Sequence, residues 1–339
     1  MNKMHDNLGP SGSTTRGASS LYDYENGQSV VKCHEVMQGP PSWYKMNTRP
    51  KHLPQEKQQE LSRIVETIRS HHDVEMVILF GSYARNDWVE DEYEEGGTTY
   101  TYRSDYDILI IMADKSRERD VEHDSILREA LEPGQDGTRV NWIVHTIQHV
   151  NQMLAERRYF FMDILKDGYM LYDSRRYVLA RPPKELEPET MLKISQEYFQ
   201  EWMDSADEFR IDSQNALERK SYKNSAFYLH QAAERYITCL LLVETGYRPK
   251  EHDMERLLKQ ASGFDRAFDS VFPLNSKIER RLFDLLRRAY VDARYNKSYR
   301  INDDELNTLS DRVDQLKTIA MRVCGERIAT LRRVIDGTG

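Results

Sequence analysis

The sequence predicts an α+β fold in which a domain of one sheet with helices is followed by an all-α, up-and-down helical bundle. Three observations predict it. Short apolar runs typical of buried strands occur between residues 76 and 173. A stretch rich in proline and charge follows at 180–190, and apolar residues then recur at helical spacing. We therefore expect a flexible tail at 1–50, a sheet domain at 51–175, a linker at 176–190 and a helical bundle at 191–333.

The tail is rich in Gly, Ser, Pro, Asn and Thr and lacks apolar periodicity. A helix is expected from about Pro54 to His71, because Leu61, Ile64, Val65 and Ile68 recur at helical spacing. Strands are expected at 76–80 (MVILF), 106–112 (YDILIIM), 139–145 (RVNWIVH) and 168–173 (GYMLYD). A hairpin that turns at Gly96-Gly97 should join the first two strands, and a helix should cover about 148–165.

The second half carries two apolar stripes at helical spacing. One contains Ala226, Leu229, Ala233, Ile237 and Leu240, and the other contains Leu282, Leu285, Leu286, Ala289 and Ala293. Helices near 190–218, 221–244, 276–296 and 303–333 would form a bundle of four or more antiparallel helices.

The composition excludes several classes. Hydrophobic residues make up 39% and charged residues 31% of 339 residues, which is typical of a soluble protein with two domains. No apolar run approaches the length of about 18 residues that a membrane helix needs. The N-terminus lacks the apolar core of a signal peptide, and three widely spaced cysteines indicate a reducing cytoplasm. The net charge of −8 argues against broad non-specific nucleic-acid binding.

A turn and a carboxylate pair stand out between the first two apolar strands. Gly81 and Ser82 directly follow one strand, and Asp105 and Asp107 open the other. Residues two apart on a strand point to the same face, so the two carboxylates should project together. Carboxylate oxygens are ligands for Mg²⁺, while a glycine lets the backbone approach a phosphate and Arg85 could neutralise its charge. This order predicts a site for magnesium and a nucleotide.

At these residues the sequence resembles a known family. "FGSYAR…SDYDILII" is similar to the signature of the minimal nucleotidyltransferases of the DNA polymerase β superfamily, over about residues 55 to 175. The resemblance implies a polymerase-β-like sheet in which Gly81 and Ser82 bind nucleotide phosphates and Asp105 and Asp107 bind two magnesium ions. It implies transfer of a nucleoside monophosphate from a nucleoside triphosphate, with ATP expected, onto a hydroxyl, and release of pyrophosphate.

Two residues depart from that pattern. Asn86 takes the place of a glycine after the arginine, and asparagine tolerates positive φ better than most residues. Asn141 takes the place of the family's third carboxylate, and an amide cannot accept a proton from a hydroxyl. His145, on the same strand face, is a candidate base, and Asp163 is a second.

Residues 280–301 are rich in arginine, and Arg280, Arg287 and Arg294 share a helix face. The alternatives are a solvated face or a phosphate site with Tyr290, Tyr295 and Tyr299 for base stacking. The pattern "SAFYLHQAAERY…LLRRAYVDARYNKSYRI" resembles a HEPN domain over about residues 190 to 330. Ribonucleases of that family carry a histidine shortly after the arginine, where this sequence has Tyr299.

That resemblance implies nucleotide binding through Arg294 and Tyr299, and a homo-oligomer formed through the helical domain. By resemblance to paired toxin–antitoxin systems, Tyr295 or Tyr299 is a candidate acceptor. His230 and His252 are expected to make structural hydrogen bonds or caps.

Three readings remain open. The leading one is a magnesium-dependent nucleotidyltransferase whose acceptor is a protein tyrosine, an RNA end or a small molecule. The second is a non-catalytic nucleotide-binding regulatory or stress-response module, which Asn141 favours. The third is a HEPN ribonuclease of a toxin–antitoxin-like system, which Tyr299 disfavours because a tyrosine pKa of about 10 suits proton transfer poorly.

Overall fold

A computed structural model describes residues 23–25, 28–30, 46–95, 98–132, 137–250 and 252–337. The chain divides into two compact units. The first holds the described residues up to Gln148 together with Tyr169–Leu179, and the second holds His149–Gly168 and the described residues from Ala180 onward. The second unit therefore includes residues 149–168, which the expected boundaries assign to the sheet domain.

The first unit is built on a four-stranded sheet in the order β7-β6-β3-β8. The strands are β3 (Met76–Phe80), β6 (Tyr106–Met112), β7 (Val140–Thr146) and β8 (Tyr169–Asp173). β3 runs antiparallel to β6 and β8, and β6 runs parallel to β7. The central strands β3 and β6 are almost entirely buried, as their continuous apolar runs predict.

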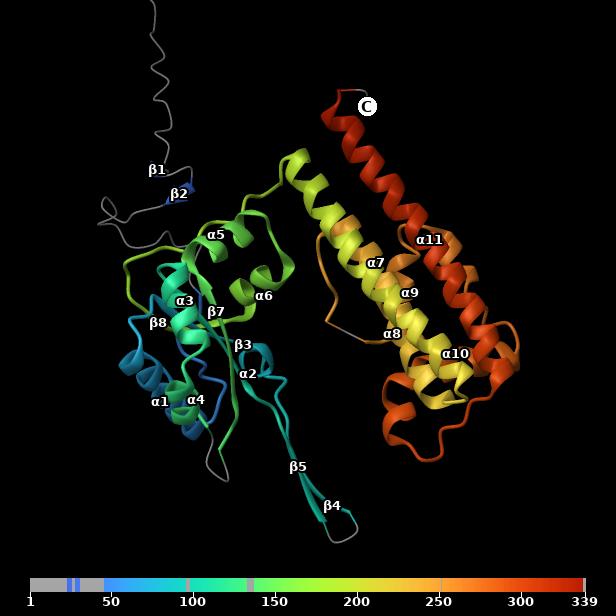
Figure 1. Cartoon of the computed structure of the whole chain (residues 1–339), viewed down its shortest axis with the longest axis horizontal. Coiled ribbons are helices and arrows are strands. Elements are labelled where there is room, and N and C mark those ends of the chain that lie inside the picture. The colour runs from blue at the N-terminus through green and yellow to red at the C-terminus, as the bar shows by residue number, and fades with distance from the viewer. Residues whose placement is uncertain are drawn as a thin grey trace, which may run out of the picture. The chain divides into compact units, whose positions relative to one another are not determined.

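Helices pack against this sheet, and a hairpin extends away from it (Figure 1). α1 (Gln55–His71) buries Leu61, Ile64, Val65 and Ile68 in one apolar cluster with α3 (Lys115–Glu122), α4 (Ser125–Ala130) and one face of the sheet. A short helix, α2 (Gly81–Arg85), follows β3. β4 (Glu90–Glu95) and β5 (Thr98–Arg103) form the expected antiparallel hairpin between α2 and β6, while Gly96 and Gly97 lie outside the described residues.

The helix expected over 148–165 is instead two helices, α5 (Ile147–Ala155) and α6 (Tyr159–Asp167). Arg157 between them has φ +51°, which an α-helix cannot continue through. The Arg157 Nη1 atom donates to the carbonyls of Pro183 and Lys184 at 2.7 and 2.9 Å. The break is thus bonded to the segment expected as a linker.

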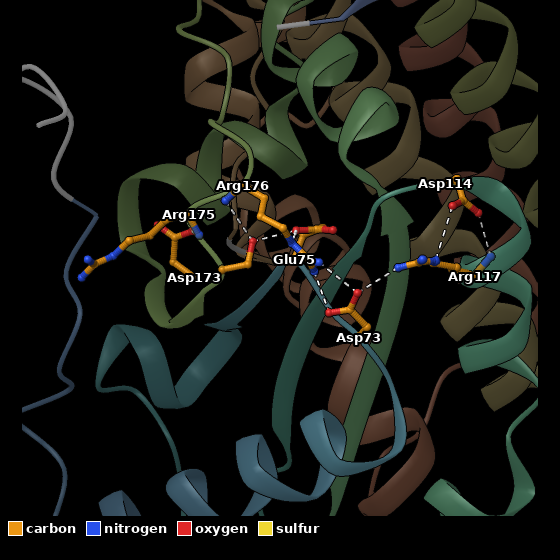
Figure 2. Close-up of polar contacts among 8 residues, drawn as sticks. Asp73, Glu75, Asp114, Arg117, Asp173, Arg175 and Arg176 are labelled. Atoms are coloured by element: carbon orange, nitrogen blue, oxygen red, sulfur yellow. Dashed lines mark hydrogen bonds and ion pairs between the residues drawn. The ribbon is translucent and has the colours of Figure 1, made fainter. Parts of the chain in front are cut away.

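An ion-pair cluster ties the exit from β8 to the entry of β3 (Figure 2). Arg176 donates to both carboxylate oxygens of Asp73 at 3.0 and 2.7 Å and to Glu75 at 2.9 Å. Ser174 donates to the same Glu75 oxygen at 2.6 Å, and Arg117 of α3 reaches Asp73 at 3.1 Å. The Glu75 side chain is only 2% exposed, so these donors stabilise a charge that would otherwise be costly to bury.

The second unit is helical after residue 188. Its helices are α7 (Pro188–Glu218), α8 (Tyr222–Thr245), α9 (Met254–Ala261), α10 (Lys277–Tyr295) and α11 (Asp303–Ile335), with a 3₁₀ turn at Arg266–Ser270. Both predicted apolar stripes are buried in one core, which lies on α8 and α10 and extends over α7 and α11. The expected α+β fold with a following helical region is confirmed.

Most of the expected tail lies outside the described residues. Within it, β1 (Asp23–Glu25) and β2 (Gln28–Val30) pair antiparallel. Asn47 forms a parallel bridge with Tyr169, and its carbonyl accepts a hydrogen bond from Met170 N at 2.8 Å. The end of the tail therefore lies alongside β8. Among the helices that the structure describes, none is long and apolar enough to span a membrane.

Candidate functional site

The register of the sheet brings three segments of the first unit to one place. β3 and β6 run antiparallel with Phe80 opposite Asp107, so the next residue, Gly81, lies beside Asp107. β6 and β7 run parallel with Asp107 opposite Asn141. Asp105 lies just before the start of β6, and the Asn141 Nδ2 atom donates to its Oδ2 at 2.9 Å. The turn, the carboxylate pair and Asn141 thus meet at one end of the sheet.

Gly81 is required at this position for two reasons. Its φ is +73°, in the region that side chains other than glycine enter at a cost. A Cβ atom there would lie 2.0 Å from Oδ2 and 2.8 Å from Cγ of Asp107. The turn therefore packs its backbone directly on the carboxylate, and any larger residue would displace Asp107.

The turn ends at an asparagine in the left-handed conformation. Asn86 has φ +63° and ψ +32° and caps α2, with its N–H bonded to the Ser82 carbonyl. The expectation that Asn86 preserves the turn is confirmed. Ser82 is partly exposed, and the exposed Arg85 forms an ion pair with Asp87 at 3.0 Å.

The carboxylates of Asp105 and Asp107 are both half-buried. Burial raises the pKa of Asp107, and the nearby Asp105 raises it further, while Arg85 and Asn141 oppose the rise. The Asn141 Nδ2 atom donates to Asp105 Oδ2 at 2.9 Å. A bound cation would relieve the repulsion between the two carboxylates.

The donor set fits magnesium better than a metal that the protein ligates alone. Among the described residues, no group of three or more His, Cys, Asp or Glu side chains could hold a metal ion. Mg²⁺ takes one or two carboxylates and completes its shell with water and phosphate oxygens. Asp105 and Asp107 could supply those two carboxylates.

Within the first unit, the structure does not bring the candidate base His145 to the aspartates. His145 lies on β7 four residues beyond Asn141, roughly 13 Å along the strand. Its Nδ1 faces Glu118 of α3 at 3.9 Å. Asp163 belongs to the second unit, where its carboxylate lies 3.2 Å from the Lys250 ammonium.

Sequence reasoning missed a polar residue behind this site. Lys57 of α1 is only 8% exposed, and its ammonium lies 2.6 Å from Glu90. A signal was present, because Lys57 precedes Leu61, Ile64 and Ile68 at the spacing of the buried stripe. A lysine at a buried position needs a partner of opposite charge, because an unpaired lysine is almost never found there.

The second unit presents Arg294 on an aromatic surface. Arg287 and Arg288 of α10 pair with Asp284 at 2.9 and 3.3 Å. Arg294 is exposed, and its Cζ lies over three rings, at 4.9 Å from Phe227, 4.7 Å from Tyr290 and 5.0 Å from Tyr295. Its guanidinium therefore combines a cation with stacking surfaces, which is the combination expected of a nucleotide contact.

Tyr299 is placed differently from the expectation. It is 3% exposed, and its hydroxyl donates to the Leu285 carbonyl at 2.9 Å. Burial raises the pKa of Tyr299, which makes it a still poorer proton donor or acceptor near neutral pH. The structure thus shows Tyr299 as a core residue and not as a nucleotide ligand or a substitute for the ribonuclease histidine. Tyr295, at 73% exposed, is the accessible tyrosine of the two.

Two histidines flank a buried glutamate on α8. His252 Nδ1 lies 2.9 Å from Glu234 Oε1, and His230 Nε2 lies 3.5 Å from Oε2. Burial would raise the pKa of Glu234, but the two histidines lower it to about 2. His230 also contacts the Leu286 carbonyl at 2.9 Å, and His252 stacks on Tyr290. Both histidines make the structural contacts that the sequence predicts.

Comparisons with known proteins agree with this picture of the second unit. Residues 199–323 match the model of the HEPN domain. A comparison with curated proteins gives no match. A solved structure described as a nucleotidyltransferase-like protein from Exiguobacterium sibiricum 255-15 has 13% identity and a TM-score of 0.35, covering 79% of this chain and 78% of that chain. Similarity at this level does not establish a shared fold. The match of residues 199–323 to the HEPN model confirms the prediction of a HEPN domain in the helical unit.

Proposed function

We propose that the chain is a magnesium-dependent nucleotidyltransferase with a nucleotide-binding HEPN domain. The observation that carries the proposal is the fit of Gly81 against Asp107. The turn that would hold phosphates lies in direct contact with the Asp107 carboxylate that would hold the metal, and Asn141, opposite Asp107, donates to Asp105. A pair of half-buried carboxylates costs stability unless a cation binds them.

The proposed reaction moves a nucleoside monophosphate to a hydroxyl. The acceptor oxygen forms a bond to the α-phosphorus, the bond from that phosphorus to the bridging oxygen of the β-phosphate breaks, and pyrophosphate leaves. The hydroxyl proton passes to solvent. Bound magnesium would neutralise phosphate charge as it shifts between oxygens. Asp105 and Asp107 would hold the metal, the backbone and hydroxyl of Ser82 would contact phosphate, and Arg85 would supply further positive charge.

The acceptor class stays open between a protein tyrosine, an RNA end and a small molecule. Of the two candidate tyrosines, Tyr295 and Tyr299, only Tyr295 is exposed, and its ring lies 5.0 Å from the Arg294 guanidinium carbon. ATP as the donor, a homo-oligomer, a cytoplasmic location and a toxin–antitoxin-like setting stay predictions.

A second candidate is a nucleotide-binding module without turnover. Asn141 favours it, because an amide lies where the family's third carboxylate would be and donates to Asp105. Such a module would bind a nucleoside triphosphate and release no pyrophosphate.

Label transfer separates the two candidates. The protein would be incubated with magnesium and each of four nucleoside triphosphates labelled at the α-phosphate, alone, with total RNA and with cell extract. Label on protein, RNA or a small molecule, absent from the Asp105→Asn/Asp107→Asn double variant, is the expected result. No label and no pyrophosphate under any condition would leave the binding module as the better account.

A further inference from the structure

The three segments that form the candidate site in the first unit also share one buried polar network. α2 carries Gly81, β6 carries Asp107, and the chain entering β7 leads to Asn141. Each of these segments contributes one further side chain to the network. The three side chains are those of Tyr83, Tyr106 and Thr138, all of which are buried.

Lys57 of α1 is the centre of this network. Its ammonium lies 2.6 Å from Glu90 Oε1, donates to Thr138 Oγ1 at 2.9 Å and lies 3.7 Å from Glu60 Oε2. The two glutamates extend the network to the tyrosines. Tyr106 donates to Glu60 at 2.8 Å, and Tyr83 donates to Glu90 at 3.4 Å. We call this set (Lys57, Glu60, Tyr83, Glu90, Tyr106 and Thr138) the Lys57 network.

The charge on Lys57 is maintained by its partners. Burial would lower the pKa of Lys57, but the hydrogen bond to Glu90 and the interactions with Tyr83, Glu60 and Glu90 raise it overall. Lys57 thus contacts both glutamates and joins three segments, while Arg103 Nε also lies 3.5 Å from Glu90 Oε1. Without Lys57, the two glutamates would lose the cation that they share behind the site.

The contacts between the tyrosines show how a change at Lys57 would reach the site. The Tyr83 and Tyr106 rings lie 4.4 Å apart between centroids. Tyr83 is two residues from Gly81, and Tyr106 separates Asp105 from Asp107. A shift of either ring therefore moves the turn relative to the carboxylates, where Gly81 leaves no spare room beside Asp107.

We propose that Lys57 is a positioning residue that fixes the turn at Gly81 against the carboxylates of Asp105 and Asp107 without touching metal or nucleotide. The inference rests on the proposed function, since it concerns the same site. Supporting groups behind metal ligands are worth roughly 10- to 100-fold in metal affinity. Lys57→Met should therefore raise the dissociation constant for Mn²⁺ by roughly 10- to 100-fold.

The test measures the Mn²⁺ affinity of each variant in the absence of nucleotide. The electron paramagnetic resonance signal of the free ion reports how much Mn²⁺ is bound, and circular dichroism checks that each variant is folded. Arg176→Met is the matched control, because Arg176 also pairs with a buried glutamate of the same unit but lies at the opposite end of β3. The control should lose stability and keep wild-type Mn²⁺ affinity. Equal affinities in Lys57→Met and wild type, or equal losses in both variants, would overturn the proposal.

If Lys57→Met does not fold, Tyr106→Phe replaces it. That variant removes one hydroxyl of the network and should weaken Mn²⁺ binding by about 3- to 10-fold, the value of one hydrogen bond. Unchanged affinity in Tyr106→Phe would then count against the proposal.

The Asp105→Asn/Asp107→Asn variant separates this inference from the proposed function. If it binds Mn²⁺ as well as wild type does, the metal site itself is refuted. If it loses binding while Lys57→Met does not, only the positioning role is refuted.

Discussion

Gly81→Ala tests the contact on which the candidate site depends. The residue has φ +73°, and an alanine there costs about 1–2 kcal/mol in backbone conformation. The added Cβ would also lie 2.0 Å from Asp107 Oδ2, so the carboxylate must move by more than about 1 Å to restore ordinary contact. Forcing that side chain away from its rotamer adds about 1 kcal/mol. The free energy of unfolding should therefore fall by about 2–3 kcal/mol, and metal binding should weaken.

Gly246→Ala is the matched control for this substitution. Gly246 has φ +67° and ends α8, but no heavy atom lies within 4 Å of the position of its Cβ. Its alanine variant should lose only the conformational part, about 1–2 kcal/mol. Comparison of the two variants therefore isolates the displacement of Asp107.

The assay is urea unfolding of each variant, with Mn²⁺ titration at a temperature where both are folded. Gly81→Ala should bind Mn²⁺ at least about tenfold more weakly than Gly246→Ala, because a ligand displaced by about 1 Å loses its geometry. Wild-type affinity in Gly81→Ala would refute the close packing of turn and carboxylate.

Two further predictions concern stability. Arg176→Met leaves Glu75, whose side chain is 2% exposed, with Ser174 as its remaining side-chain donor. The free energy of unfolding in urea should fall by about 2–3 kcal/mol. A decrease below about 0.5 kcal/mol would mean that the cluster is only a surface contact. Glu234 has a pKa of about 2 in the folded protein and 4.5 as an unperturbed side chain, so it adds roughly 3 kcal/mol to the free energy of unfolding. This contribution is fully present above pH 4.5 and is lost as the pH falls toward 2. The stability gap between wild type and Glu234→Gln should thus shrink by about 2 kcal/mol from pH 7 to pH 3, and a constant gap would contradict the assigned charge.

Much of the fold follows from local patterns in the sequence. The central strands are continuous apolar runs, and the stripes of α1, α8 and α10 follow helical spacing, so both are readable without tertiary information. The short α2 escaped prediction because residues 81–85 span little more than one turn and show no periodicity. The break at Arg157 also escaped, because a positive φ at arginine has no sequence signal.

The candidate site was predictable in its residues but not in its contacts. Gly81, Asp105 and Asp107 are marked by the strands that they flank, whereas their meeting depends on the antiparallel register of β3 and β6. Tyr299 was misplaced because an aromatic residue after a helix can face either way. The chain after α10 turns back, so the Tyr299 hydroxyl donates to the Leu285 carbonyl in the core.

The most direct test of the central claim is calorimetric titration with a triphosphate analogue that cannot be cleaved between the α- and β-phosphates. The account predicts binding that requires magnesium in the wild-type protein and is lost in Asp105→Asn/Asp107→Asn. An Arg294→Ala variant would show how much of any remaining, metal-independent binding belongs to the helical unit. Equal binding by wild type and the double aspartate variant, with or without magnesium, would contradict the assignment of the turn and the two aspartates as a nucleotide site.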